Sequence, residues 1–504
     1  MTPERRRFLV MGLDGGTFDL LDPLFAAGKL PFLAAQVRDG FSAPLTSVFP
    51  PKTIPAWYSF ATGLDPGTLG IFGFTEPDGG PGKSRLIHTY RPADALWDHL
   101  SRRGRTVGVL NFPLRTPGPV NGFFVPGMFS DDLQAYPADL APRIRAELGA
   151  EPYLPELPPF RASDRAAWME LANRSVDQRR RVARSLIERY RPEFLFVLFR
   201  ETDRIEHQHW AELSRPVGEF APDLLSFWEG VDRALADIDA AFRSAGGPAV
   251  TLVISDHGHG AAVTDFFTNR WLLERGYLAF TNGGDPWRRR VVSRLLLGID
   301  RVPGLTALLA PIADRLQGGR RRERFAQAMT GDASFETMAA RIDWKRTVAF
   351  SYPVPEGIYL NPYGPPLTPE RRAEIVARLR KELEQYPEAR IEVFEPREIY
   401  RGVRNEQAPA LLLRINCLET ESRMDFAYPH PMLHHRPGYF YGSGVHRMDG
   451  ILIASGAGVQ ARGRSPEAFS LLDIAPTVLE GMAVPVPAAM SGRSLAGRLA
   501  GTAV

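Results

Sequence analysis

Short apolar runs alternate with longer amphipathic stretches along most of this chain. Runs of this kind, bounded by turn residues, are typical of buried strands, and we predict strands over 8–13, 105–111, 194–199, 249–255 and 450–454. Apolar residues at helical spacing predict helices over 18–37, 93–103, 164–190, 224–245 and 470–480. Because strands alternate with helices, we expect an α/β fold with a mostly parallel central sheet and helices on both faces.

The composition indicates a globular protein with a large apolar core. The chain has 504 residues, of which 44% are hydrophobic and 24% are charged. Its 61 basic and 58 acidic residues give a net charge of +3, which indicates neither a nucleic-acid polymer nor an acidic membrane surface as a partner. The single cysteine, Cys417, excludes an intramolecular disulfide and a zinc site built from several cysteines.

The sequence shows no membrane-spanning pattern. No stretch has the roughly 20 consecutive apolar residues that such a helix needs. The first apolar run follows three arginines, as in a signal peptide, but it stops at Asp14 and no small-residue cleavage site comes after it. We therefore expect no transmembrane segment and a cytoplasmic location.

One segment, 286–345, differs from the rest of the chain. It lacks strand patterns, shows helical periodicity over 295–316 and carries arginine clusters at 288–290 and 320–323. We predict a helical insertion that covers a core made of two parts, 1–285 and 346–504. Contact with a membrane surface is the alternative, although basic faces are ordinary on surface helices.

Acidic and histidine side chains gather at the ends of the predicted strands. They are Asp14, Asp203, His207, Asp256 and His257, together with His446 just before the strand at 450–454. In open α/β sheets, ligands bind at the carboxyl ends of the strands. Carboxylates and imidazoles are ligands that Zn²⁺ or Mn²⁺ accepts. The sequence therefore predicts a metal site at this edge of the sheet.

Each of these residues alone also has an ordinary structural role. A carboxylate after a strand is more often a helix cap or a turn residue. Asp256 and His257, however, follow a mostly apolar run directly, and two ionisable groups at the end of a buried strand are costly unless something pairs them. A metal ion would do so.

Several ordered motifs resemble one family. These segments are LDGGTFDLL at 13–21, FPPKTIPAWYSFATGLDPGTLGI at 49–71, TDRIEHQHW at 202–210, SDHGHG at 255–260, GVHRMDGILIASG at 444–456 and DIAPTVLEGMAVPVPAAMSGRSL at 473–495. Together they resemble the type I phosphodiesterases/nucleotide pyrophosphatases of the alkaline phosphatase superfamily. The resemblance runs over nearly the whole chain, with 286–345 its least certain part.

The resemblance implies an alkaline phosphatase-like fold and a metal-dependent phosphoric ester hydrolase that acts on a small phosphorylated substrate. Thr53 matches the family's nucleophile, which coordinates one metal together with Asp14, Asp256 and His257. The ligands of a second metal match Asp203, His207 and His446. Two divalent cations are implied, preferably zinc, with manganese as the alternative.

Other histidines lie near these motifs. His434 and His435 are alternatives to His446, which we prefer because it stands in the family's Gly-x-His-x-x-Asp-Gly context. His209 and His259 are expected to line the site or to orient the ligands.

The sequence departs from the family at one position. Related pyrophosphatases carry Asn three residues after the nucleophile, where it donates to a phosphate oxygen; here that position is Ala56. Lys52, Asn111 or a backbone N–H are the candidates to replace this donor. The change leaves diester, monoester and phosphonate substrates open, and a binding protein that has lost turnover is a further alternative.

Two other members of the superfamily fit less well. A sulfatase would need a Cys/Ser-x-Pro-x-Arg motif, and the only cysteine is far from Thr53. A cofactor-independent phosphoglycerate mutase would use a serine nucleophile in different surroundings.

Overall fold

The computed structural model describes residues 6–87, 93–113, 117–128, 133–281, 339–402, 408–424, 431–435 and 442–501. Most of the helical insertion predicted at 286–345 therefore lies outside the described residues.

The described part of the chain is built around a nine-stranded sheet with the strand order β19-β2-β18-β8-β1-β7-β5-β6, and β20 pairs with β2. The strands are β1 (Arg7–Leu13), β2 (Phe41–Thr46), β5 (Val107–Phe112), β6 (Gly122–Pro126), β7 (Phe194–Phe199), β8 (Ala249–Ile254), β18 (Asp449–Gly456), β19 (Gly463–Arg464) and β20 (Phe469–Ser470). Only β18 runs antiparallel to its neighbours in this sheet, β2 and β8. The predicted α/β class with a mostly parallel sheet is confirmed.

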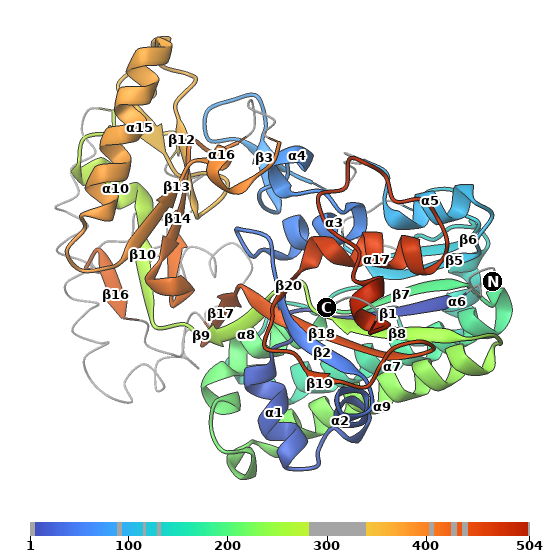
Figure 1. The fold of residues 1–504 in the computed structure, drawn as a ribbon. Helices are drawn as coiled ribbons and strands as arrows, with labels where there is room; N and C mark the ends of the chain where they lie inside the picture. The colour runs from blue at the N-terminus through green and yellow to red at the C-terminus, as the bar shows by residue number, and fades with distance from the viewer. Residues whose placement is uncertain are drawn as a thin grey trace.

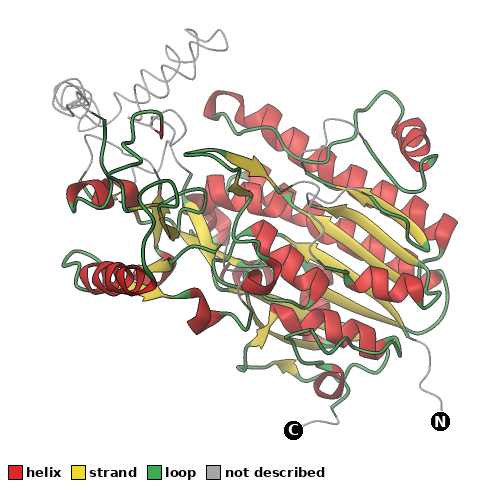
Figure 2. Cartoon of the chain, turned by 90° about the horizontal axis from the view of Figure 1, so that it is seen from above, coloured by secondary structure: helices red, strands yellow, loops and turns green. Residues whose placement is uncertain are grey.

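Helices cover both faces of this sheet (Figure 2). One face packs against α1 (Phe18–Ala26), α2 (Pro31–Arg38), α6 (Leu140–Leu148), α7 (Arg165–Tyr190) and α9 (Pro222–Ser244). The other packs against α3 (Thr53–Thr62), α5 (Leu96–Arg102), α17 (Ile474–Gly481) and α18 (Ala496–Leu499). Side chains of a strand alternate between the faces, so Phe196 and Val197 of β7 belong to different cores.

The helix predicted over 18–37 is two helices in the structure. Gly28 has a φ of +67°, a left-handed conformation that glycine adopts readily, and the chain turns there between α1 and α2. Pro31 then begins α2, where its missing N–H costs no hydrogen bond. The other helices and strands predicted for the central sheet form within a few residues of their expected ends.

Residues from the middle of the chain build a second, smaller lobe (Figure 1). Its elements are β10 (Thr264–Phe267), α10 (Thr268–Glu274), β11 (Ala349–Phe350), β12 (Gly357–Leu360), α15 (Pro369–Glu384), β13 (Ile391–Phe394), α16 (Pro396–Ile399), β14 (Leu411–Ile415), β15 (Thr420–Arg423) and β16 (Leu433–His435). They enclose a separate apolar core around Trp271, Ile358 and Leu379. After these elements the chain returns to the large sheet at β18.

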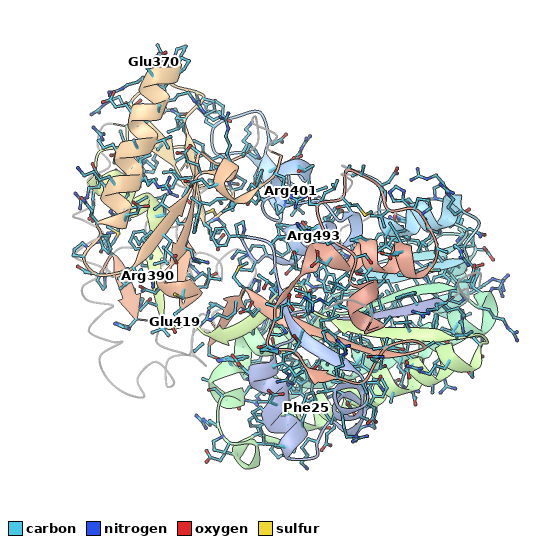
Figure 3. The ribbon with its side chains drawn as sticks, viewed as in Figure 1. Phe25, Glu370, Arg390, Arg401, Glu419 and Arg493 are labelled. Atoms are coloured by element: carbon cyan, nitrogen blue, oxygen red, sulfur yellow. The ribbon has the colours of Figure 1, made fainter. Side chains whose placement is uncertain are left out.

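The two lobes touch through residues that lie just before and just after α3 in the chain. The short helix α4 (Pro66–Leu69) is capped by Asp65, which also accepts a hydrogen bond from the backbone N–H of Arg401 at 3.1 Å. Figure 3 labels Arg401 at this junction. Lys52 reaches across to Glu356 of the small lobe at 2.7 Å. The short hairpin of β3 (Thr75–Pro77) and β4 (Ser84–Leu86) lies beyond α4.

Among the described residues, no helix is both long enough and apolar enough to cross a membrane.

Candidate active site

The site forms at the carboxyl ends of three neighbouring strands, β8, β1 and β7. Asp14 follows β1, Asp256 lies two residues after β8, and α8 (Glu201–Leu213) begins just beyond β7. Parallel pairing places these chain ends side by side. The predicted convergence at one edge of the sheet is therefore what the fold produces.

Asp14, Asp256 and His257 form the first group of metal-ligand type. Their donor atoms all lie within 4.8 Å of one another, and the three side chains are completely buried. Trp57 Nε1 donates to Asp14 Oδ2 at 3.0 Å, and the backbone N–H of Gly15 donates to Asp256 Oδ1 at 3.2 Å. The other carboxylate oxygens, Asp14 Oδ1 and Asp256 Oδ2, and His257 Nε2 make no hydrogen bond. Buried polar atoms without partners are rare, and a cation would satisfy these.

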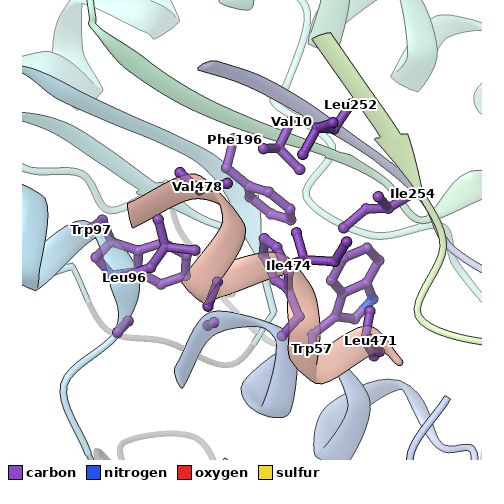
Figure 4. Packing of buried hydrophobic residues seen from close by; sticks show 14 of the residues in the cluster. Val10, Trp57, Leu96, Trp97, Phe196, Leu252, Ile254, Leu471, Ile474 and Val478 are labelled. Atoms are coloured by element: carbon purple, nitrogen blue, oxygen red, sulfur yellow. The ribbon is translucent and has the colours of Figure 1, made fainter. Parts of the chain in front are cut away.

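Trp57 reaches Asp14 because α3 packs tightly under the sheet. Figure 4 shows its indole among Phe196, Ile254 and Ile474. A Cβ at Gly12 would lie only 2.6 Å from the indole, so the missing side chain at position 12 allows this packing. The core thereby fixes one ligand of the first group.

Asp203, His207, His259 and His446 form the second group, again with donor atoms within 4.8 Å of one another. Asp203 and His207 lie one turn apart on α8. Nε2 of His207 and Nε2 of His446 each lie 3.2 Å from Asp203 Oδ1. The structure thus brings together the three residues predicted for the second metal.

The ring orientations of these histidines suit metal binding. His207 Nδ1 lies 2.9 Å from the carbonyl oxygen of Gly444, and His446 Nδ1 lies 2.6 Å from that of Pro51. His257 Nδ1 lies 3.2 Å from the carbonyl oxygen of Gly258. Because a carbonyl only accepts, these contacts favour a proton on each Nδ1, which would leave Nε2 to bind a cation.

A two-stranded ribbon joins the two groups. β9 (Gly258–Ala261) follows His257 and pairs antiparallel with β17 (Gly444–Arg447), which places His446 opposite His259. The ring of His257 stacks on that of His446 with 3.6 Å between centroids. The two groups are therefore adjacent.

Sequence reasoning missed Glu206 and gave His259 a supporting role. Both side chains are completely buried, and Glu206 Oε2 lies 3.0 Å from His259 Nδ1. A Cβ at Gly15 would lie within 3 Å of both, and with its φ of +77° this position favours glycine. The signal was Glu206 itself, a charged residue within the same motif as Asp203 and His207.

The site carries excess negative charge. Burial raises the pKa of Asp14 to about 8, although Arg200 nearby lowers it. Burial also raises the pKa of Asp256 and of Glu206 well above their usual ranges, with neighbouring carboxylates adding to the effect. Burial lowers the pKa of His446 to about 4 and that of His257 well below its usual value. Without a cation, these carboxyl groups resist ionisation and the neighbouring imidazoles stay neutral. This pattern is typical of a site built to hold cations.

Thr53 is the first residue of α3 and is 1% exposed. It lies in the wall of a cavity of about 670 Å³ between the two lobes, which Asp203, His207 and His446 also line. The small lobe contributes Val354, Glu356 and Met424 to the opposite wall. The N-terminus of α3 thus meets the cavity, where its exposed N–H groups favour a negative charge.

Of the two side chains proposed to replace the missing asparagine donor, only Lys52 lines the cavity. Lys52 lines the cavity beside Thr53 and pairs with Glu356. Asn111 does not line this cavity; its amide donates to the carbonyl of Leu198 at 3.0 Å, and its φ is +69°. Ala56 is completely buried in the core beside Trp57.

The other histidines near the motifs lie apart from the second group. His434 and His435 belong to β16 of the small lobe. There His434 lies opposite Asp265 in the antiparallel pairing of β16 with β10. His209 Nδ1 lies 2.8 Å from Glu212. Of the alternatives weighed for the second metal, the structure brings His446 to Asp203.

Known proteins resemble this chain in family and in fold. A model of the family described as type I phosphodiesterase / nucleotide pyrophosphatase matches residues 8–334. A search of curated proteins finds no significant match. Among solved structures, the chain is similar to wild-type alkaline phosphatase PafA, with a TM-score of 0.55 at 14% identity over 98% of this chain and 99% of that one. It is also similar to phosphonoacetate hydrolase from Sinorhizobium meliloti 1021, with a TM-score of 0.51 at 15% identity over 96% of each chain. These similarities establish an alkaline phosphatase-like fold.

Proposed function

Because the chain belongs to the type I phosphodiesterase / nucleotide pyrophosphatase family, a family of phosphoric ester hydrolases, we propose that Thr53 is its nucleophile and that two divalent cations serve it. The observation that carries the proposal is the pair of adjacent ligand groups, whose buried donor atoms include several that make no hydrogen bond, together with the cavity that Thr53 shares with the second group.

The charge of the site supports two cations. Asp14, Asp203, Asp256 and Glu206 are buried carboxylates, and the guanidinium of Arg200 has Glu156 as an additional partner at 3.2 Å. When these four carboxylates are ionised, two divalent cations would balance their charge. We assign Asp14, Asp256, His257 and Thr53 to one cation and Asp203, His207 and His446 to the other. The donor set of carboxylates and imidazoles suits zinc, with manganese as the alternative.

The chain's own residues then have defined roles. Bound cations supply a lowered hydroxyl pKa and neutralise charge on phosphoryl oxygens. Thr53 Oγ gives its proton to water and attacks phosphorus, and the ester oxygen leaves and takes up a proton from water as the new P–O bond forms. Water then cleaves the phosphothreonine and frees the hydroxyl. The N-terminus of α3 stabilises the negative charge on the transferred group throughout.

The test measures metal content and turnover on the same sample. Protein loaded with Zn²⁺ or Mn²⁺ should hold two cations per chain by elemental analysis. It should also hydrolyse bis(4-nitrophenyl) phosphate or 4-nitrophenyl phosphate, and a chelator should abolish this activity. Cation-loaded protein that turns over neither ester would instead favour a phospho-ligand-binding role. A stoichiometry of zero would refute the proposal.

A further inference from the structure

Arg200 is a buried cation at the centre of the site that no role described above uses. It is the residue directly after β7, its side chain is 5% exposed, and it lines the cavity with Thr53. Its Nε lies 3.3 Å from Asp14 Oδ2 and its Nη2 lies 3.6 Å from Asp203 Oδ2. Arg200 therefore reaches one carboxylate from each of the two ligand groups.

The guanidinium has hydrogen-bonding capacity left over. Nε is buried and makes no hydrogen bond, because its approach to Asp14 lacks hydrogen-bond geometry. The Nη2–Asp203 separation is longer than a hydrogen bond. Nη1 is the better satisfied nitrogen, with Glu156 at 3.2 Å and Met128 Sδ beside it. An arginine held only as a structural counter-ion would more often bond a carboxylate through two nitrogens.

Cation binding would direct these donors toward a substrate. When Asp14 and Asp203 share their charge with cations, their attraction for Arg200 weakens. An oxyanion that bridges the two ligand groups must lie near both carboxylates, which is where Arg200 points. Ala56 offers no donor for such an oxygen, since its side chain is a buried methyl group in the core.

We propose that Arg200 binds the non-bridging phosphoryl oxygens of the substrate and favours phosphomonoesters over phosphodiesters. This inference rests on the proposed function and deepens it. A monoester dianion carries one more negative charge on those oxygens than a diester anion, so it gains more from a buried guanidinium. As the ester bond breaks, Arg200 stabilises charge on the transferred group without forming a covalent bond.

The experiment compares the wild type with Arg200→Gln, Arg200→Lys and a matched control. The control is Arg105→Gln, because Arg105 is also a buried arginine, 7% exposed and paired with Glu193 at 2.6 Å, but lies at the opposite end of the sheet before β5. For each metal-loaded protein we would measure cation content, the affinity for inorganic phosphate by calorimetry, and kcat/KM on 4-nitrophenyl phosphate and bis(4-nitrophenyl) phosphate.

Arg200→Gln should keep two cations per chain and bind phosphate at least about tenfold more weakly. Its kcat/KM should fall about 10²–10³-fold on the monoester and only about tenfold on the diester. For Arg200→Lys, the phosphate affinity and both kcat/KM values should lie between those of the wild type and those of Arg200→Gln. An ammonium keeps the charge but loses the planar donor pair. Arg105→Gln should match the wild type in phosphate affinity and in the ratio of the two activities.

Three results would overturn the proposal: wild-type phosphate affinity in Arg200→Gln, equal losses on both esters, or loss of the cations from that variant. The last would make Arg200 a support for the ligand groups. Failure of the proposed function is distinguishable, because a wild type that turns over neither ester but binds phosphate more tightly than Arg200→Gln would refute hydrolysis alone.

Discussion

Thr53 is the side chain on which the proposed chemistry depends. Lys52, not Thr53, is the N-cap of α3, so removal of the hydroxyl does not remove a helix cap. Thr53→Ala should therefore fold and retain most bound metal, because three protein ligands remain for the first cation, as in open zinc sites. Hydrolysis should fall by several orders of magnitude, and Thr53→Ser should keep substantial activity. Steady-state assays beside elemental analysis check this; a wild-type rate for Thr53→Ala would refute the nucleophile assignment.

Trp57 is a positioning residue, since it acts on the site through its hydrogen bond to Asp14. Trp57→Phe keeps an aromatic ring in the core but leaves Asp14 Oδ2 without that donor. We expect cation affinity to fall about 10–100-fold, as happens when other partners of metal ligands are removed. A metal titration measures this. Trp228→Phe is the matched control, because Trp228 is buried in α9 and its indole N–H makes no hydrogen bond; an equal loss there would assign the effect to general destabilisation.

The ribbon of β9 and β17 is the element that brings the two ligand groups together. A Cβ at Gly258 would overlap the backbone carbonyl oxygen of Asp449, which cannot move without shifting β18. Gly258→Ala should therefore displace both His257 and His446 and reduce cation stoichiometry as well as stability. Elemental analysis and thermal unfolding test this together.

The matched glycine for that experiment is Gly230 in the middle of α9. The nearest atom to a Cβ there lies 3.7 Å away, an ordinary contact. Gly230→Ala should leave metal content unchanged and stabilise the protein by ~0.5–1 kcal/mol, because alanine loses less conformational freedom in a helix. Unchanged metal content in Gly258→Ala would contradict the role given to the ribbon.

Cation binding should also stabilise the folded chain as a whole, since the ligand groups draw on β1, α8, β8 and β17. These elements meet only in the native state, so cations bind it in preference to the unfolded chain. Each cation at a free concentration one hundred times its Kd should contribute about 2.7 kcal/mol. Chelation should lower the melting temperature and added Zn²⁺ should restore it, as measured by thermal unfolding. A melting temperature that a chelator leaves unchanged would argue against bound cations.

Local patterns were enough to predict much of the fold and of the candidate site. Strands such as 194–199 were predictable because a short, wholly apolar run has few other stable environments than the interior of a sheet. Asp14 and Asp256 could be selected because they stand at strand ends, where a turn exposes polar groups to a shared edge. Thr53 came from the resemblance to a family, because no spacing distinguishes it from other threonines.

Long-range contacts determined the rest, and no local pattern encodes them. His259 joins the second group because β9 pairs with β17, a register between residues nearly two hundred positions apart. Arg200 and Glu156 meet in the cavity from separate segments, and the small lobe assembles short strands whose apolar runs are too brief to recognise. Pairing of distant strands depends on which apolar faces bury each other, and this sums over the whole core. The candidate ligands were therefore readable from the sequence, whereas the residues that surround them required the fold.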